Sequence, residues 1–140
     1  MFDLPIGEIM EQKKFLTAAP EASVRDVAKL MAEKNAGAVM VVKNDCLVGI
    51  VTERDVVFRA VAKGLNVEST KLASVMTADP IAMDPAKSYG QALLLMQENG
   101  FRHIPVVENG KPVGIVSSRN AMDPELEEFV SEERRREHHS

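Results

Sequence analysis

The stretch GIVTERD at residues 49–55 is followed, sixty-five positions later, by GIVSSRN at residues 114–120. Pro20 and Pro85, each shortly before an apolar helical pattern, keep the same spacing. This period is longer than the roughly 20–50 residues of solenoid and propeller repeats, so the sequence predicts two copies of one small domain rather than an array. The chain is therefore interpreted as a duplication, and a structural element predicted in one copy is expected at the corresponding position of the other.

Hydrophobic periodicity and capping signals predict the same order of elements in each copy. The first copy predicts a helical turn at 6–10, a helix capped by Ser23, strands at 38–42 and 47–51, and a second helix with the apolar stripe Val56, Val57, Ala60 and Val61. The second copy predicts a turn at 72–76, a helix capped by Ser88, strands at 103–107 and 112–116 joined through Asn109-Gly110, and a helix that restarts at Pro124. The expected fold class is α/β (α+β), with small apolar sheets flanked by helices.

The domain division follows the duplication. We expect a first repeat at 1–65, a second repeat at 66–125, and a C-terminal helix and tail at 124–140. The join lies around residues 63–66, where a glycine and an asparagine follow a helical pattern. The C-terminal helix has one apolar face, which either packs on its own domain or contributes to a dimer.

Composition limits the classes of function. A net charge of −4 gives no overall attraction to nucleic acid or anionic lipid, and Arg134-Arg135-Arg136 is flanked by glutamates. No apolar run approaches the ~18 residues of a membrane span. The N-terminal residues lack the basic start and apolar core of a secretory signal, so we expect a cytoplasmic protein. With a single cysteine, no intrachain disulfide or thiolate metal cluster is expected.

Residues 52–55 stand where a strand is expected to end and a helix to begin, and they permit two interpretations. In the first, Thr52 is the N-cap and Asp55 the N3 partner of a capping box. In the second, the same corner binds a ligand, because a helix start attracts phosphate and a carboxylate accepts hydrogen bonds from ribose hydroxyls. Gly49 would let the preceding strand pack closely.

This ordered set of elements, given twice, resembles a tandem pair of cystathionine-β-synthase-type (CBS) domains, a Bateman module. The similarity covers residues 6–122 and includes the proline lead-ins, the hairpins, and the match of GIVTERD to the family phrase G-x-x-T-x-x-D. The second copy departs from that phrase at Ser117 and Asn120. The resemblance implies two repeats with pseudo-twofold symmetry whose sheets pack together. It also implies two clefts that bind AMP, ADP, ATP, S-adenosylmethionine or NAD, and a homodimer.

The resemblance assigns residues to two clefts, each shared by both repeats. The first cleft would take Thr52, Arg54 and Asp55 from the first copy and Met83, Asp84, Phe101 and Arg102 from the second. The second cleft would take Ser117, Arg119, Asn120, Arg102 and His103 from the second copy and Ala18, Ala19, Ala36 and Gly37 from the first. We expect no metal ligands and no catalytic residues among them.

The two clefts are expected to differ. The first has the Asp55 carboxylate for ribose but no basic residue at positions 36–38, where the resemblance implies a phosphate contact. The second has basic residues at that point, but its Asn120 amide is a weaker acceptor than a carboxylate. Our hypothesis is that the first cleft favours the nucleoside and the second the phosphorylated end. His103 either binds phosphate or is a strand-end histidine bonded to a carbonyl.

Three classes of function are to be distinguished for such a chain. The preferred one is a non-catalytic regulatory module that senses an energy or metabolite signal through an adenosine-containing ligand and acts on a partner protein. In this role an adenine nucleotide or S-adenosylmethionine would be the ligand, and no cofactor would be required. The second is a ligand-free dimerisation or scaffold module. The third, an enzyme, is disfavoured because the sequence offers no Ser/His/acid set, metal cluster or P-loop.

Overall fold

The computed structural model describes residues 2–10 and 15–118. The first part of the chain forms η1 (Ile6–Glu8), β1 (Leu16–Ala18), α1 (Val24–Lys34), β2 (Ala38–Lys43), β3 (Cys46–Thr52), α2 (Glu53–Asp55) and η2 (Val56–Val61). The second part forms η3 (Leu72–Ser74), β4 (Thr77–Ala78), α3 (Tyr89–Asn99), β5 (His103–Glu108) and β6 (Lys111–Ser117). The strands make one sheet in the order β1-β2-β3-β4 and a hairpin sheet, β5-β6. This mixture confirms the predicted α+β class.

The duplication is visible in the strand pairing. In the first hairpin Ala38 pairs with Thr52, and in the second His103 pairs with Ser117, each sixty-five positions later. Both hairpins also shift register at the same point, between residues 41 and 42 and between residues 106 and 107. A β-bulge is a specific feature that is conserved within families, so the shared bulge indicates that the two halves are repeats of one structural unit.

The predicted helix and hairpin signals are confirmed. Ser23 accepts a hydrogen bond from the Asp26 N–H at 3.0 Å, and Ser88 forms a capping box with Gln91. The first hairpin turns through Asn44-Asp45 and the second through Asn109-Gly110, all with positive φ. Such paired left-handed residues match the right-handed twist of the strands that they join.

The second helix of the first copy is not the regular helix that the sequence predicted. Residues Val56–Val61 form a π-helix, with the Ala62 N–H bonded to the Val57 carbonyl at 2.8 Å. Its wider turn places Ala60 in the core and leaves Val57 and Val61 51% and 60% exposed. The expected four-residue buried stripe was therefore wrong for Val57 and Val61. The predicted C-terminal helix at 124–140 lies outside the described residues.

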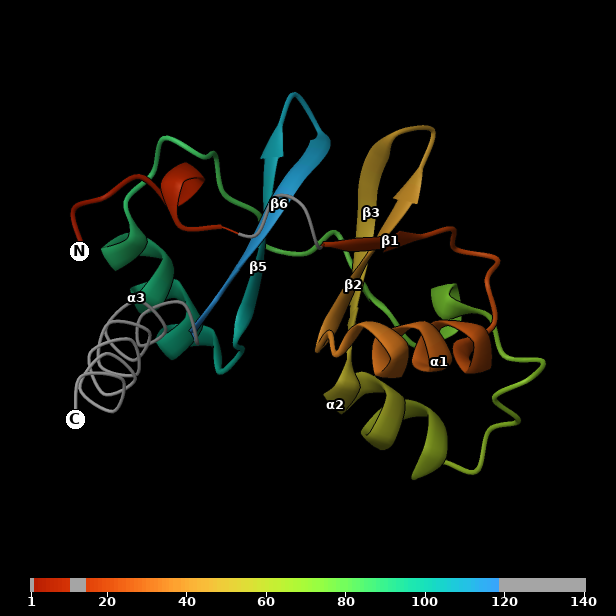
Figure 1. Cartoon of the computed structure of the whole chain (residues 1–140). Coiled ribbons are helices and arrows are strands. Elements are labelled where there is room, and N and C mark those ends of the chain that lie inside the picture. The colour runs from red at the N-terminus through yellow and green to blue at the C-terminus, as the bar shows by residue number, and fades with distance from the viewer. Residues whose placement is uncertain (1, 11–14, 119–140) are drawn as a thin grey trace, which may run out of the picture.

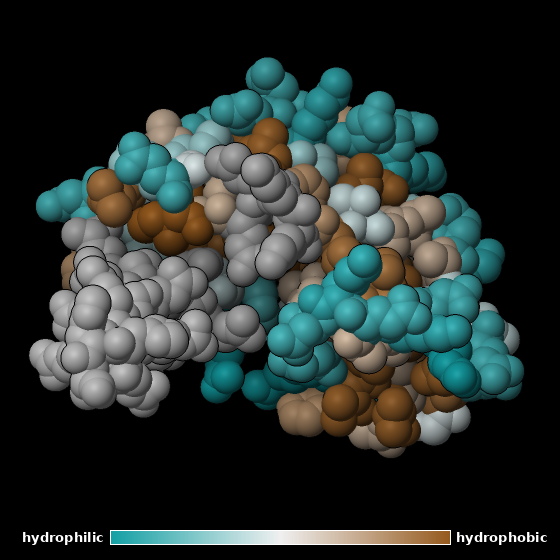
Figure 2. Space-filling model, in the orientation of Figure 1, coloured by the Kyte–Doolittle hydropathy of each residue, from teal (hydrophilic) through white to brown (hydrophobic). Residues whose placement is uncertain are grey.

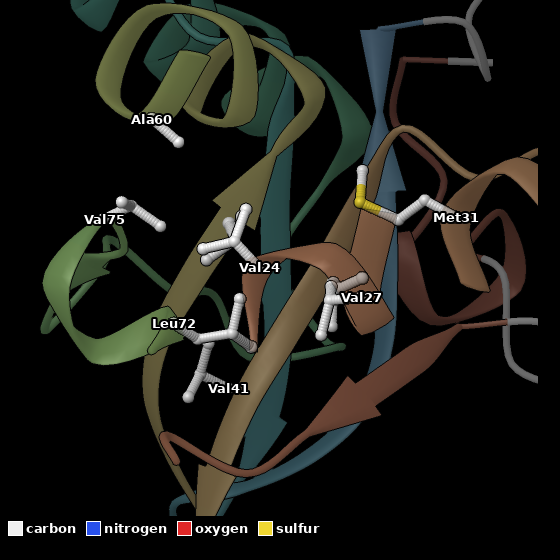
Figure 3. Close-up of a cluster of buried hydrophobic side chains, with 9 residues drawn as sticks. Val24, Val27, Met31, Val41, Ala60, Leu72 and Val75 are labelled. Carbon is white, nitrogen blue, oxygen red and sulfur yellow. The ribbon is translucent and has the colours of Figure 1, made fainter. Parts of the chain in front are cut away.

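Each half of the molecule has its own core. The first cluster comprises Val24, Val27, Met31, Val39, Val41, Val51, Ala60, Leu72 and Val75 (Figure 3). The second comprises Ile6, Met83, Tyr89, Ala92, Met96, Ile104, Val106 and Val116. Figure 1 shows the corresponding division, with α1, β1, β2 and β3 in one half and α3, β5 and β6 in the other.

The short segment at the start of each repeat, around Ile6 and around Leu72, packs in the core of the other repeat. We call these two segments the lead-ins. Ile6, from the start of the chain, lies in the second core, and its N–H donates to the Lys87 carbonyl at 2.8 Å. Leu72, near the start of the second repeat, lies in the first core, and its N–H donates to the Ala22 carbonyl at 2.9 Å. In Figure 1 the red η1 accordingly lies in the half with α3, and the green η3 lies beside α1. Each repeat thus completes the core of the other.

Candidate functional site

A cleft of about 760 Å³ opens between the two halves, at the corner where β3 passes into α2. The first repeat contributes Ile50, Thr52, Glu53, Arg54, Asp55, Val57, Phe58 and Arg59 to its lining. The second contributes Thr77, Asp79, Pro80, Ile81, Gly100, Phe101, Arg102, His103 and Pro105. The volume lies within the roughly 300–1,000 Å³ that small-molecule sites occupy. The lining joins an apolar wall to a row of charged side chains.

The corner itself is a capping box. The Thr52 N–H and hydroxyl donate to Asp55 Oδ2 at 2.9 and 3.1 Å, and the Asp55 N–H donates to Thr52 Oγ1 at 3.3 Å. The local interpretation of these two residues is therefore confirmed. The Asp55 side chain is held rigidly at the cleft wall, before any ligand is considered.

The Asp55 carboxylate keeps some capacity to accept further hydrogen bonds. Its Oδ1 lies 3.5 Å from Arg59 Nε, and Arg59 also donates to the carbonyls of Val75 and Met76 at 3.3 Å. A carboxylate offers about four acceptor positions, and the Thr52 N–H, the Thr52 hydroxyl and Arg59 take three of them. One acceptor position on Asp55 is left by these contacts.

Gly49, at the start of the repeated phrase, permits a close approach of chains. A Cβ at this position would collide with the Met76 side chain and lie 3.1 Å from the Thr77 carbonyl oxygen. The glycine thus lets β4 pair with β3, where Gly49 lies opposite Ala78. β4 in turn leads directly into Asp79, Pro80 and Ile81 of the cleft wall.

The side chain of Arg54 covers an aromatic ring. Its guanidinium carbon lies 4.7 Å from the centre of the Phe58 ring, one turn further along the chain. The ring is 54% exposed and lines the cleft. Phe58 was not among the predicted site residues, although its position four residues after Arg54 is a helical neighbour spacing that could have indicated the contact.

The structure brings together six of the predicted residues: Thr52, Arg54, Asp55, Phe101, Arg102 and His103. Of these, His103 had been assigned to the second cleft. Its ring approaches Gly37, where a Cβ would lie 3.4 Å from the imidazole Nε2 and 3.4 Å from Glu53 Oε1. Because the starts of β2 and β5 meet between the repeats, a side chain assigned to one cleft can reach the other.

Met83 and Asp84 do not line this cleft. Met83 is buried in the second core, where its N–H donates to the Pro105 carbonyl and its carbonyl accepts from the Val107 N–H. Asp84 accepts from the Ala86 N–H at 2.8 Å in a local turn. The neighbouring segment does reach the cleft, but through Asp79, Pro80 and Ile81, which are not among the predicted site residues.

The second predicted cleft is only partly described, because Arg119 and Asn120 lie outside the described residues. Ser117 is placed at the end of β6, and its carbonyl accepts from the Tyr89 hydroxyl at 2.8 Å. Ala18 ends β1 and Ala19 follows it. Ala36 and Gly37 line a hollow of about 300 Å³ between α1 and η2. The binding roles of these residues stay predictions.

The backbone of the second corner repeats that of the first. The Ser118 N–H donates to the Arg102 carbonyl at 3.0 Å, and the Glu53 N–H donates to the Gly37 carbonyl at 3.0 Å. Each bond ties the start of a hairpin to the end of the same hairpin. The two corners are thus built alike, and they differ in the side chains that they present.

Apolar side chains remain exposed on two of the helices. Val57, Phe58 and Val61, on η2, and Leu94, on α3, are each more than half exposed. Figure 2 shows brown side chains gathered at the lower right of the molecule, where α2 and the following turns lie. Among residues 2–10 and 15–118, no helix has the length and apolar character of a membrane span. The same residues contain no cluster of three potential metal ligands from His, Cys, Asp and Glu.

Comparison with known families gives a match along most of the chain. The family model of the CBS domain matches twice, at residues 6–61 and 72–124. A Schizosaccharomyces pombe protein, meiotically up-regulated gene 70 protein, is 42% identical over 100 residues, which are 71% of this chain and 14% of that protein. The protein MK0525 of Methanopyrus kandleri is 30% identical over 137 residues, 95% of this chain and 69% of that one.

Solved structures show the same architecture. A conserved protein from Pyrococcus horikoshii superposes with a TM-score of 0.82 at 28% identity, covering 89% of this chain and 94% of its own. The protein PAE2072 from Pyrobaculum aerophilum, solved in complex with AMP, gives 0.76 at 26% identity, covering 84% and 89%. The protein CBSX2, also solved with AMP, gives 0.74 at 25% identity, covering 89% and 97%.

Proposed function

This chain belongs to the CBS domain family, and from that premise we propose that it is a regulatory module which binds adenosine-containing ligands between its two repeats. The observation that carries the proposal is the cleft of about 760 Å³ whose wall holds the Thr52–Asp55 corner. The AMP complexes of two similar structures support an adenine nucleotide as the ligand. AMP, ADP, ATP, S-adenosylmethionine and NAD are the candidates.

The lining supports a specific placement of such a ligand. Ile50, Ile81 and Phe101 offer an apolar wall for the base. The Thr52–Asp55 corner faces the same cleft and offers the remaining acceptor position of the Asp55 carboxylate to a ribose hydroxyl. Arg102 and His103 stand beside the corner and can meet a 5′-phosphate. Binding would then regulate a partner protein by favouring one arrangement of the repeats over another.

We expect adenosine-containing ligands to raise the thermal stability of the protein. A ligand that binds only the folded state stabilises it by about 2.7 kcal/mol at one hundred times its dissociation constant. For a chain of this size the midpoint of thermal unfolding should rise by roughly 5–10 °C. The measurement is differential scanning fluorimetry with AMP, ADP, ATP, S-adenosylmethionine and NAD, and guanosine as the control. A midpoint unchanged by all five would contradict the proposal and favour the scaffold function.

The alternative function, a ligand-free dimerisation or scaffold module, draws on the exposed apolar side chains of η2. We propose that the protein is a homodimer whichever function holds, and that Val57 and Val61 lie in the interface. Contiguous exposed apolar surface commonly marks a protein interface. We also propose that the protein is not a catalyst, that it is cytoplasmic, and that it regulates a partner protein.

Val61→Glu is expected to dissociate the dimer. A carboxylate buried without a partner at an apolar interface should weaken association about a hundredfold or more. Size-exclusion chromatography with light scattering over a dilution series measures this. Ala73→Glu, at an exposed position on η3, makes the same charge change elsewhere and should leave the mass unchanged. A wild-type monomer at every concentration, or a Val61→Glu dimer of wild-type affinity, would refute this interface.

A further inference from the structure

We propose that the cleft selects adenosine ligands of low negative charge, the nucleoside and its monophosphate, over the di- and triphosphates, and that Glu53 sets this selectivity. The inference rests on the proposed function, because it concerns the ligand of the same cleft. It follows from the balance of charged side chains in the lining, from the contacts that two of the arginines already make, and from the position of the Glu53 carboxylate.

The charges of the described lining cancel. Three arginines, Arg54, Arg59 and Arg102, face three carboxylates, Glu53, Asp55 and Asp79. A site for a polyphosphate draws its affinity from an excess of cations or from a metal ion, since ATP carries about four negative charges. This lining has no such excess while His103 is neutral, and one extra positive charge when it is protonated.

Two of the three arginines are already engaged. Arg59 lies 3.5 Å from Asp55 and donates to the carbonyls of Val75 and Met76. Its charge is therefore already paired within the wall of the cleft. Arg54 covers the ring of Phe58. Within residues 2–10 and 15–118, no comparable contact holds the side chain of Arg102, which is exposed. One arginine, helped by His103, suffices for one phosphate and not for three.

Glu53 adds a negative charge where additional phosphates would extend. It lies in the same turn as Thr52 and Asp55 and lines the same cleft, beside the place proposed for the 5′-phosphate. Glu53 Oε1 and the His103 ring both border Gly37 from opposite repeats. A first phosphate can bind His103 and Arg102 there, whereas further phosphates would bring like charges against Glu53.

The second repeat offers an internal comparison. The residue that corresponds to Glu53 is Ser118, which is uncharged. Its N–H makes the same backbone bond, to Arg102, that Glu53 makes to Gly37. A neutral side chain at this place is therefore compatible with the fold of the corner, and the carboxylate of Glu53 is a separate feature of the first cleft.

The test is isothermal titration of adenosine, AMP, ADP and ATP in magnesium-free buffer with wild-type protein and two variants. Glu53→Gln removes the charge and keeps the shape of the side chain. The matched control, Glu33→Gln, makes the same change at an exposed position of α1 away from the cleft. We expect wild-type protein to bind ATP at least about tenfold more weakly than AMP. Glu53→Gln should reduce that ratio several-fold, mainly through tighter binding of ATP, and Glu33→Gln should leave the ratio as in the wild type.

Two outcomes would overturn the inference while leaving the proposed function intact: equal affinity of the wild type for AMP and ATP, or an unchanged ratio in Glu53→Gln. If none of the four compounds, adenosine included, binds the wild type, the proposed function fails and this inference fails with it. Repeating the titrations at higher salt gives a further check. The preference for AMP should shrink as the repulsion is screened, and a preference independent of salt would overturn the role of charge.

Discussion

Replacing Leu72 with alanine is expected to destabilise the protein by about 2–5 kcal/mol, the usual cost of a Leu→Ala cavity in a core. Leu72 belongs in sequence to the second repeat, yet its side chain is fully buried in the core of the first (Figure 3). Thermal or urea unfolding followed by circular dichroism measures the loss, and the midpoint of thermal unfolding should fall by roughly 10 °C.

The same experiment tests the exchange of lead-ins. Leu65→Ala is the control, because Leu65 is 41% exposed and should lose far less stability than Leu72. Because each core contains a segment of the other repeat, we expect wild type and Leu72→Ala to unfold in one transition. Two separate transitions, with only one shifted by the substitution, would show that the halves are independent and would contradict the exchanged cores.

Asp55→Ala is expected to weaken binding of adenosine-containing ligands by about ten- to a hundredfold, because a hydrogen bond to a charged acceptor is worth about 1.5–3 kcal/mol. It should also cost about 0.5–2 kcal/mol of stability, since the capping box is lost. Titration calorimetry gives the first quantity and denaturant unfolding the second.

A conservative variant separates the two roles of Asp55. Asp55→Asn keeps a side-chain oxygen for the Thr52 N–H but removes the charge beside Arg59. It should recover most of the lost stability and little of the lost affinity. Ligand affinity in Asp55→Ala equal to that of the wild type would show that Asp55 is only a cap and that the ligand, if bound, lies elsewhere.

Much of the local structure could be predicted because it depends on neighbours in sequence. Ser23 and Ser88 cap helices through bonds to residues three positions away. Asn109-Gly110 forms a turn because both residues tolerate positive φ. Because the chain is duplicated, each capping and turn signal occurs twice. This repetition supported the prediction of the α+β class and the resemblance to CBS domains.

Features that depend on distant contacts could not be predicted in this way. Nothing in the sequence around Ile6 or Leu72 indicates which core will receive it, because either core offers an apolar surface. The π-helix was missed because residues 56–61 have the apolar spacing of an ordinary helix. The presence of His103 in the first cleft could not be predicted for a similar reason, since the meeting of β2 and β5 is a property of the packed repeats.

The exchanged lead-ins also set an order of events during synthesis. When the first repeat has left the ribosome, its core still lacks Leu72 and Val75, which are translated later. Ile6 is translated long before Tyr89 and Ile104, with which it forms the second core. N-terminal domains commonly fold first during synthesis, but this chain offers no complete core to do so. We therefore expect the nascent first repeat to stay unfolded until its successor emerges, and the two to acquire protease resistance together.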